Sequence, residues 1–162
     1  MIALLLIYNF NAMKVDYLTI PEITVSYKDT VKTSERAKIT CANDAVTILN
    51  TAFENCMEHH EEVNVLYLNN ASRVLGISNV SKGGISKALI DVRIILQTAL
   101  KVSASAILLS HNHPSGCCKP SSEDVAMTEM VKKGCEAIGI RLFDHLIVSN
   151  EFYTSFAEEG IL

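Results

Sequence analysis

The sequence predicts one α/β domain, and three of its features carry that prediction. The chain has 162 residues, of which 49% are hydrophobic, and this length supports one substantial core more readily than two. Short apolar runs rich in β-branched and aromatic residues alternate with segments of helical periodicity. A group of chemically active residues directly follows one continuous apolar run. Ligand sites of α/β folds lie at such positions, past the carboxyl ends of strands.

The first forty residues are expected to form an extension and a linker (1–40), and residues 41–162 the domain. Residues 1–10 are apolar, but they lack a basic leading region and a convincing cleavage site, and they are too short to span a bilayer. Because Met13 precedes the first charged residue, we also consider the hypothesis that residues 1–12 extend an original start.

Between this extension and the domain, the pattern changes from apolar to charged. Ile23, Val25 and Tyr27 alternate with polar residues, which predicts a short edge strand or an extended arm over 17–27. Residues 28–38 mix both charges and predict a solvated linker. The alternative is a phosphate-binding patch made of its four basic residues, Lys28, Lys32, Arg36 and Lys38.

Periodicity places the remaining elements in order. Apolar residues at helical spacing predict helices over 44–57, from Asp91 onward and over 122–138. The apolar stripe of the last helix is expected to comprise Met127, Met130, Val131, Cys135 and Ile138. Strands are predicted at 63–69, 74–80, 105–110, 140–148 and 152–156, with a turn at 82–84. The run at 105–110 is continuously apolar, as in a central strand that is covered on both faces.

Charge and cysteine content limit the classes of function. The 14 basic and 18 acidic residues give a net charge of -4, so binding of nucleic acid would need a local basic patch. The five cysteines are odd in number and irregularly spaced, which argues against a secreted disulfide framework. We therefore expect a cytoplasmic protein that does not enter a membrane.

The stretch HNHPSGCCKPSSED, residues 111–124, holds the candidate site. Side chains two apart in an extended backbone lie on the same side, so His111 and His113 can converge, whereas on a helix they would diverge by about 200°. The Pro-Ser-Gly that follows turns the chain and can bring Ser121 and Asp124 within reach. Zinc takes imidazole and carboxylate ligands, and a catalytic site keeps one position for water. We therefore predict a zinc site at His111, His113 and Asp124.

Ser121 and Asp124 also match a helix-capping box, in which a hydroxyl and a carboxylate satisfy backbone N–H groups at the start of a helix. Taken alone, this pair favours capping over catalysis. The joint spacing with the two histidines, in a loop between an apolar strand and a helix, favours a metal site. Capping by Ser121 and ligation by Asp124 are compatible.

This spacing matches the JAMM motif, and HNHPSG followed by Pro-Ser and an Asp resembles the RadC branch of the JAB/MPN superfamily. The resemblance runs from residue 61 to about 157 and includes Asp-Val-Arg at 91–93 and Asp-His-Leu-Ile at 144–147. It implies a single JAB/MPN-like domain with a mixed central sheet flanked by helices, layered as in cytidine deaminases. Cys117 and Cys118 depart from the small or acidic residues usual in RadC-like loops. We interpret them as exposed loop thiols, with zinc ligation or a redox-sensitive gate as alternatives.

The resemblance also implies roles for the site residues. The two histidines and Asp124 would be zinc ligands, and Ser121 would hydrogen-bond the oxyanion or the metal-bound water. An upstream glutamate would be the general base. In similar sequences this glutamate leads the strand pattern E-x-F-x-V-L-Y-L, which places it at Glu61. Glu62 would then point to the opposite face of the strand and is expected to be a solvated edge residue.

Metal-assisted hydrolysis of a peptide or isopeptide amide is the activity that the resemblance implies. Zinc would acidify its bound water, Glu61 would take the proton and pass it to the leaving amine, and Ser121 would stabilise the oxyanion. The expected partner is a peptide or protein, and the oligomeric state is left open. The competing hypothesis is a RadC-type protein associated with DNA repair or recombination, whose metal site is structural or weakly active. Deamination is disfavoured, because the Pro-Cys-x-x-Cys pair of zinc deaminases does not occur.

Two further residues have alternative interpretations. His145 either orients a metal ligand from the outer shell or is a hydrogen-bonded structural histidine. Arg93, at a helix start where the dipole disfavours a cation, is expected to pair with Asp91, another acidic neighbour or a partner.

Overall fold

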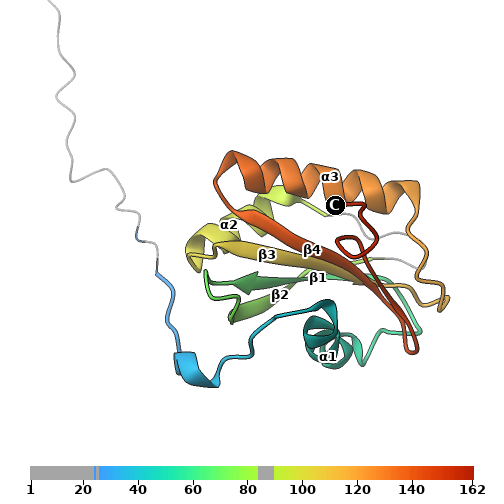
Figure 1. The fold of residues 1–162 in the computed structure, drawn as a ribbon, viewed down its shortest axis with the longest axis horizontal. Coiled ribbons are helices and arrows are strands. Elements are labelled where there is room, and N and C mark those ends of the chain that lie inside the picture. Colours follow the sequence, from blue (N-terminus) through green and yellow to red (C-terminus); the bar gives the residue numbers. More distant parts are fainter. Residues whose placement is uncertain (1–23, 25, 84–89) are drawn as a thin grey trace, which may run out of the picture.

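A five-stranded mixed sheet with helices on both faces forms the core of the computed structural model, which describes residues 24, 26–83 and 90–162 (Figure 1). The elements in chain order are a 3-10 turn η2 (Thr33–Glu35), α1 (Ala42–Phe53), β1 (Glu62–Leu68), β2 (Val74–Lys82), α2 (Val92–Lys101), β3 (Ala106–Asn112), α3 (Ser122–Ala137), β4 (Arg141–Val148) and β5 (Tyr153–Ser155). The strand order is β2-β1-β3-β4-β5. The predicted α/β fold class with a mixed, helix-flanked sheet is confirmed.

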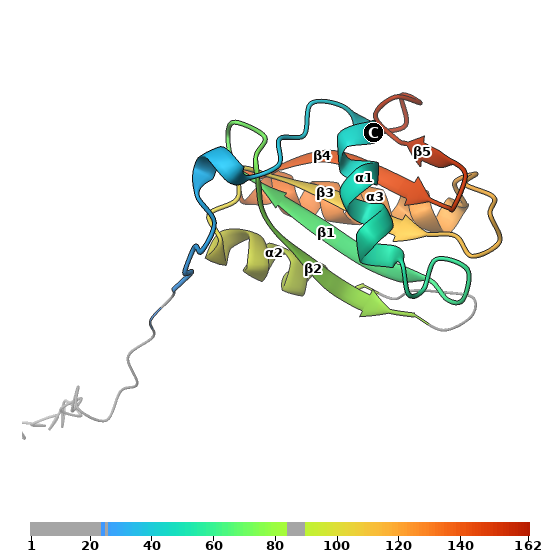
Figure 2. The same cartoon turned by 90° about the horizontal axis from the view of Figure 1, so that it is seen from below.

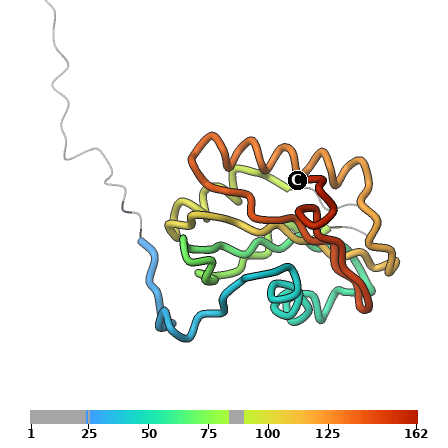
Figure 3. The backbone as a smooth tube through the Cα atoms, viewed as in Figure 1, coloured from blue at the N-terminus to red at the C-terminus, as the bar shows by residue number. Residues whose placement is uncertain are grey.

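The strand directions follow from the connections. β1 is antiparallel to β2 and β3, β3 is parallel to β4, and β4 is antiparallel to β5. The parallel pair needs a crossover, which α3 provides. Figure 3 traces this crossover from β3 through the 113–121 loop into α3 and back along β4.

Alternation along the strands divides the core between the two faces of the sheet. Leu66 and Leu108 pack with the buried residues of α1, which lies across one face (Figure 2). Val65 and Leu109 pack on the other face, with buried residues of α2 and α3. Every residue of β3 is buried, as the continuous apolar run predicted. The carboxyl end of this central strand is therefore held firmly on both sides.

Several sequence predictions are wrong in detail. The helix predicted over 44–57 instead spans Ala42–Phe53. β3 does not end at residue 110 but continues through Asn112, so the first histidine of the motif belongs to the strand. On α3, Val131 and Cys135 are buried as expected, but Met130 and Ile138 are 49% and 37% exposed. The helix instead buries Asp124, Thr128, Val131 and Cys135, a narrow stripe that leaves Met130 and Ile138 beside it.

Some predictions fall outside the described residues, namely the N-terminal ten residues, most of the 17–27 strand, and Gly84 in the predicted turn. No helix in the described ranges is both long and apolar enough to cross a bilayer.

We expect Leu108→Ala to lower the free energy of unfolding by about 2–5 kcal/mol, because Leu108 is fully buried in the central strand and its truncation leaves a cavity. Leu100→Ala is the matched control. Leu100 is 57% exposed on α2, and its truncation should change stability by no more than about 0.5 kcal/mol. Urea denaturation of the two variants measures the difference, and equal losses would contradict the assignment of β3 as the central strand.

Candidate metal centre

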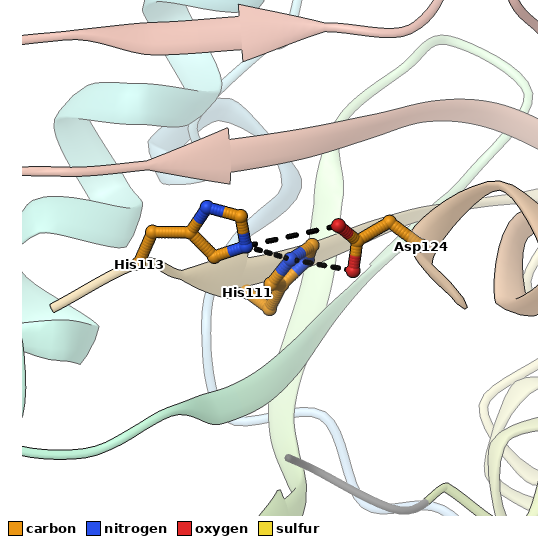
Figure 4. A group of neighbouring side chains, drawn as sticks. All are labelled: His111, His113 and Asp124. Carbon is orange, nitrogen blue, oxygen red and sulfur yellow. Dashed lines mark hydrogen bonds and ion pairs between the residues drawn. The ribbon is translucent and has the colours of Figure 1, made fainter. Parts of the chain in front are cut away.

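The centre lies where β3 ends and α3 begins. His111 is the second-last residue of β3, His113 directly follows the strand, and Asp124 is in the first turn of α3. Figure 4 shows the two imidazole rings and the carboxylate pointing toward one another. The backbone between the two histidines is extended, so their side chains point to the same face, as the His-x-His spacing predicted.

The three side chains bring their donor atoms to one point. His111 Nε2 lies 3.0 Å from His113 Nε2 and 3.1 Å from Asp124 Oδ1, and His113 Nε2 lies 3.7 Å from Asp124 Oδ2. Tetrahedral zinc with bonds of about 2.0–2.1 Å requires ligand atoms about 3.3 Å apart. The observed separations therefore fit three corners of such a site. The remaining corner would be open to another ligand.

A backbone contact fixes the orientation of His113. The chain turns at Gly116, which has a φ of +78°, and the Gly116 N–H donates to the His113 carbonyl at 3.0 Å. The turn places the Cys117 carbonyl 2.7 Å from His113 Nδ1. Because a carbonyl oxygen only accepts, Nδ1 must carry the proton, and in the neutral ring Nε2 is left with its lone pair.

The donor set fits a cation. The His113 Nε2 lone pair, the second imidazole nitrogen and a carboxylate oxygen meet within hydrogen-bonding distance. These are groups that repel one another unless a proton or a metal ion lies between them. Imidazole and carboxylate are ligands that zinc takes, and in the described residues these three form the group able to hold a metal ion.

Asp124 serves two purposes through its two oxygens. Oδ2 accepts from the Ser121 backbone N–H at 2.8 Å and from the Ser121 hydroxyl at 2.6 Å, while Ser121 Oγ accepts from the Asp124 N–H at 3.1 Å. This is the capping box, and it leaves Oδ1 facing His111. Burial raises the pKa of Asp124, but the hydrogen bond and charge of a protonated His111, whose proton a bound cation would replace, and the hydrogen bonds of Ser121 outweigh it and hold that pKa well below its ordinary value.

Comparison with known proteins identifies the family. The family model described as RadC-like JAB domain matches residues 39–161. The chain belongs to the RadC-like JAB domain family. This membership agrees with the mixed sheet flanked by helices.

Three curated relatives show how similar the chain is to other proteins and how much of each it covers. A UPF0758 protein of Porphyromonas gingivalis is 46% identical over 103 residues, which cover 63% of this chain and 45% of the relative. A UPF0758 protein of Flavobacterium johnsoniae is 40% identical over 124 residues, covering 76% and 53%. A UPF0758 protein of Aquifex aeolicus is 39% identical over 127 residues, covering 78% and 54%. The chain thus spans about half the length of the curated relatives it matches.

In this RadC-like domain the two candidate glutamates lie on opposite faces of the sheet. Val63 pairs with His111 across the β1–β3 ladder, so their side chains share a face. Glu61, two residues before Val63, precedes β1 and shares that face by alternation. In the described part of the chain no hydrogen bond or ion pair holds its carboxylate. Its role as general base stays a prediction.

The expectation that Glu62 is a solvated edge residue is wrong. Glu62 is only 8% exposed, because His60, from the segment that follows α1, and Asn79 lie against its carboxylate. Its carboxylate accepts from Asn79 Nδ2 and lies 3.0 Å from His60 Nε2. Glu62 is thus a buried, hydrogen-bonded side chain on the face away from the candidate centre.

Asn112, between the two histidines, is a positioning residue that the sequence alone did not reveal. Its side chain is fully buried on the opposite face from His111. Its Nδ2 donates toward the carbonyls of Cys56, Met57 and His60 at 2.9–3.2 Å, and its Oδ1 accepts from the Glu62 N–H at 2.8 Å. It therefore ties the start of β1, and with it Glu61, to the strand that carries the histidines.

The interpretation of the cysteines as exposed loop thiols is correct for Cys117 and wrong for Cys118. Cys118 is 8% exposed and packs with Ile147 and Phe156, and its Sγ lies 3.2 Å from the Phe152 carbonyl. Burial raises the pKa of the Cys118 thiol, which disfavours the thiolate needed for metal ligation.

The predicted pairing of Arg93 is confirmed. Arg93 Nη2 lies 2.6 Å from Asp91 Oδ2, and Asp91 Oδ1 accepts from the Arg93 N–H at 2.9 Å as the N-cap of α2.

A surface groove of about 330 Å³ borders the candidate centre at one of its three residues, His113. It runs between the 57–58 segment, the 113–116 loop and the β4–β5 turn, where Phe152 is 66% exposed. Among the described residues that line it, the carboxylates are Glu58 and Glu151, and there is no lysine or arginine.

We expect Asn112→Ala to lower the free energy of unfolding by about 2–4 kcal/mol, because it leaves the Glu62 N–H and three carbonyls without their buried partner. Thermal or urea unfolding measures this loss. Asn43→Ala, at an exposed position of α1, is the control and should stay within about 0.5 kcal/mol of the unsubstituted protein. If Asn112→Ala lowers the free energy of unfolding by no more than the control does, the hydrogen bonds of Asn112 contribute nothing to stability.

Proposed function

We propose that this chain is a zinc-dependent hydrolase of JAMM type, a metallopeptidase or isopeptidase that cleaves an amide bond. The observation that carries the proposal is that His111 Nε2, His113 Nε2 and the Asp124 carboxylate lie 3.0–3.7 Å from one another, close to the separations of three tetrahedral corners. Membership in the RadC-like JAB domain family supports it. The activity of the whole protein is part of the same proposal, since the relatives are about twice as long.

The chemistry divides between the ion and the chain. A bound zinc ion supplies Lewis acidity, which acidifies water and polarises a carbonyl. Glu61 accepts a proton from the attacking water on its carboxylate and returns it to the departing amine nitrogen. Ser121 lies beside Asp124 and is exposed, so its hydroxyl can turn from Asp124 Oδ2 toward the substrate oxygen as negative charge develops there. The Ser121 backbone N–H keeps its bond to that carboxylate throughout.

The surroundings of the centre favour a peptide over a nucleic acid. Among the described residues, those that line the groove at His113 offer carboxylates and exposed apolar surface but no lysine or arginine for a phosphate. In the linker, two of the four basic residues are paired with acidic neighbours, Arg36 with Asp29 and Lys32 with Glu35. We therefore propose a peptide or protein partner for this site.

We expect about one zinc ion per chain after loading and dialysis, and a loss of that ion in His113→Ala, which removes one of three ligands. Elemental analysis together with calorimetric titration measures both. His59→Ala, which changes an exposed histidine away from the three ligands, is the control and should retain the ion. A folded protein that binds no zinc would end the proposal.

Glu61→Gln should keep the zinc ion and lower peptide cleavage by about 10²-fold or more, because the amide cannot take the proton. The probe is a library of internally quenched peptides incubated with zinc-loaded protein. Glu62→Gln is the matched control on the opposite face, where the carboxylate is bonded to Asn79 and His60, and cleavage should persist. Loss of cleavage in Glu62→Gln alone, or cleavage that survives removal of zinc by a chelator, would contradict the assignment.

A further inference from the structure

A buried chain of hydrogen bonds runs behind the candidate centre and joins two of its three ligands. His111 Nδ1 lies 2.9 Å from His145 Nε2, and His145 Nδ1 lies 2.6 Å from Thr128 Oγ1. The Thr128 hydroxyl donates to the Asp124 carbonyl at 2.7 Å. The chain therefore begins on the ring of one ligand and ends on the backbone of another.

The Asp124 carbonyl at the end of this chain determines the direction of every hydrogen bond in it. A carbonyl oxygen accepts only, so the single proton of Thr128 is committed to Asp124. Thr128 Oγ1 must then accept from His145 Nδ1, which carries the proton of that ring. In a neutral His145 the other nitrogen, Nε2, has a lone pair and accepts from His111 Nδ1. The proton of His111 is thereby held on Nδ1, and its Nε2 presents a lone pair to the other ligands.

The surroundings of His145 keep its ring uncharged. The side chain is fully buried, and its ring stacks at a tilt on Phe156 with centroids 4.5 Å apart. Among the described residues, the hydrogen-bond partners of its ring are a hydroxyl and an imidazole, and no carboxylate bonds to the ring to stabilise a positive charge.

We propose that Thr128 and His145 are positioning residues that fix the tautomer of His111, so that its Nε2 lone pair faces the ion. The inference rests on the proposed function, since it concerns the metal site of that hydrolase. A purely structural histidine would tolerate either tautomer. Here the Asp124 carbonyl accepts the proton of Thr128 and thereby selects one tautomer. The first turn of α3, which presents the Asp124 carboxylate, therefore also determines which nitrogen of His111 carries the proton.

The test compares two substitutions of Thr128 with a matched threonine elsewhere. Thr128→Val keeps the shape but removes the acceptor for His145, and we expect the affinity for zinc to fall by about tenfold or more. Thr128→Ser keeps the hydroxyl and should stay within about twofold of the unsubstituted protein. Thr47 on α1 makes the same hydroxyl bond to the carbonyl four residues earlier, far from the site, so Thr47→Val should leave zinc affinity unchanged. Competition with a chromophoric chelator measures all four proteins.

A second measurement reads the tautomer without using the metal. Long-range proton–nitrogen correlation spectra of the zinc-free, unsubstituted protein should show His145 as a neutral ring protonated on Nδ1. A His145 protonated on Nε2 would overturn the inference, whatever the Thr128 variants do. The inference would also be overturned if zinc affinity were unchanged in Thr128→Val. An equal fall in Thr128→Ser would overturn it too, because that variant keeps the hydroxyl and its loss would come from altered packing.

The two proposals fail differently. If the unsubstituted protein binds no zinc, the hydrolase proposal fails, while the His145 tautomer still tests the direction of the hydrogen-bond chain. If zinc binds and peptides are cleaved, but His145 is protonated on Nε2 or the Thr128 variants do not change zinc affinity as expected, only the positioning role of Thr128 and His145 is contradicted.

Discussion

The capping box at the start of α3 is the interaction on which the candidate centre depends. Ser121 and Asp124 satisfy each other's backbone N–H groups, and this fixes where the helix begins relative to the end of β3. Without that fixed start, the Asp124 carboxylate would have no defined distance to the imidazoles. One local motif thus contributes to helix stability and sets the position of a candidate metal ligand.

Capping and ligation competed as interpretations of the Ser-x-x-Asp pattern, and the geometry of the Asp124 carboxylate is compatible with both. Oδ2 is bonded to Ser121, and Oδ1 faces His111. The low pKa of Asp124 has the same origin, because each neighbour favours the charged form. A carboxylate that stays ionised and is held by its own helix start needs little reorganisation to meet a cation.

Local pattern was enough to predict the strands, the helices and the approach of the two histidines, because period and spacing fix which side chains share a face. It could not reveal contacts between distant segments. Asn112 bonds to residues about fifty positions earlier, and His145 bonds to a histidine thirty-four positions away. Glu62 was misjudged because its burial depends on the segment that follows α1, and Met130 because the packing stripe of α3 is narrower than its apolar pattern.

The bond that orients His113 comes from the main chain of residue 117 and not from a side chain. Any amino acid supplies an identical oxygen there, so the identity of that residue is free to vary while the imidazole stays aligned. The exposed side chain at position 117 can therefore change without altering the bond that aligns the imidazole.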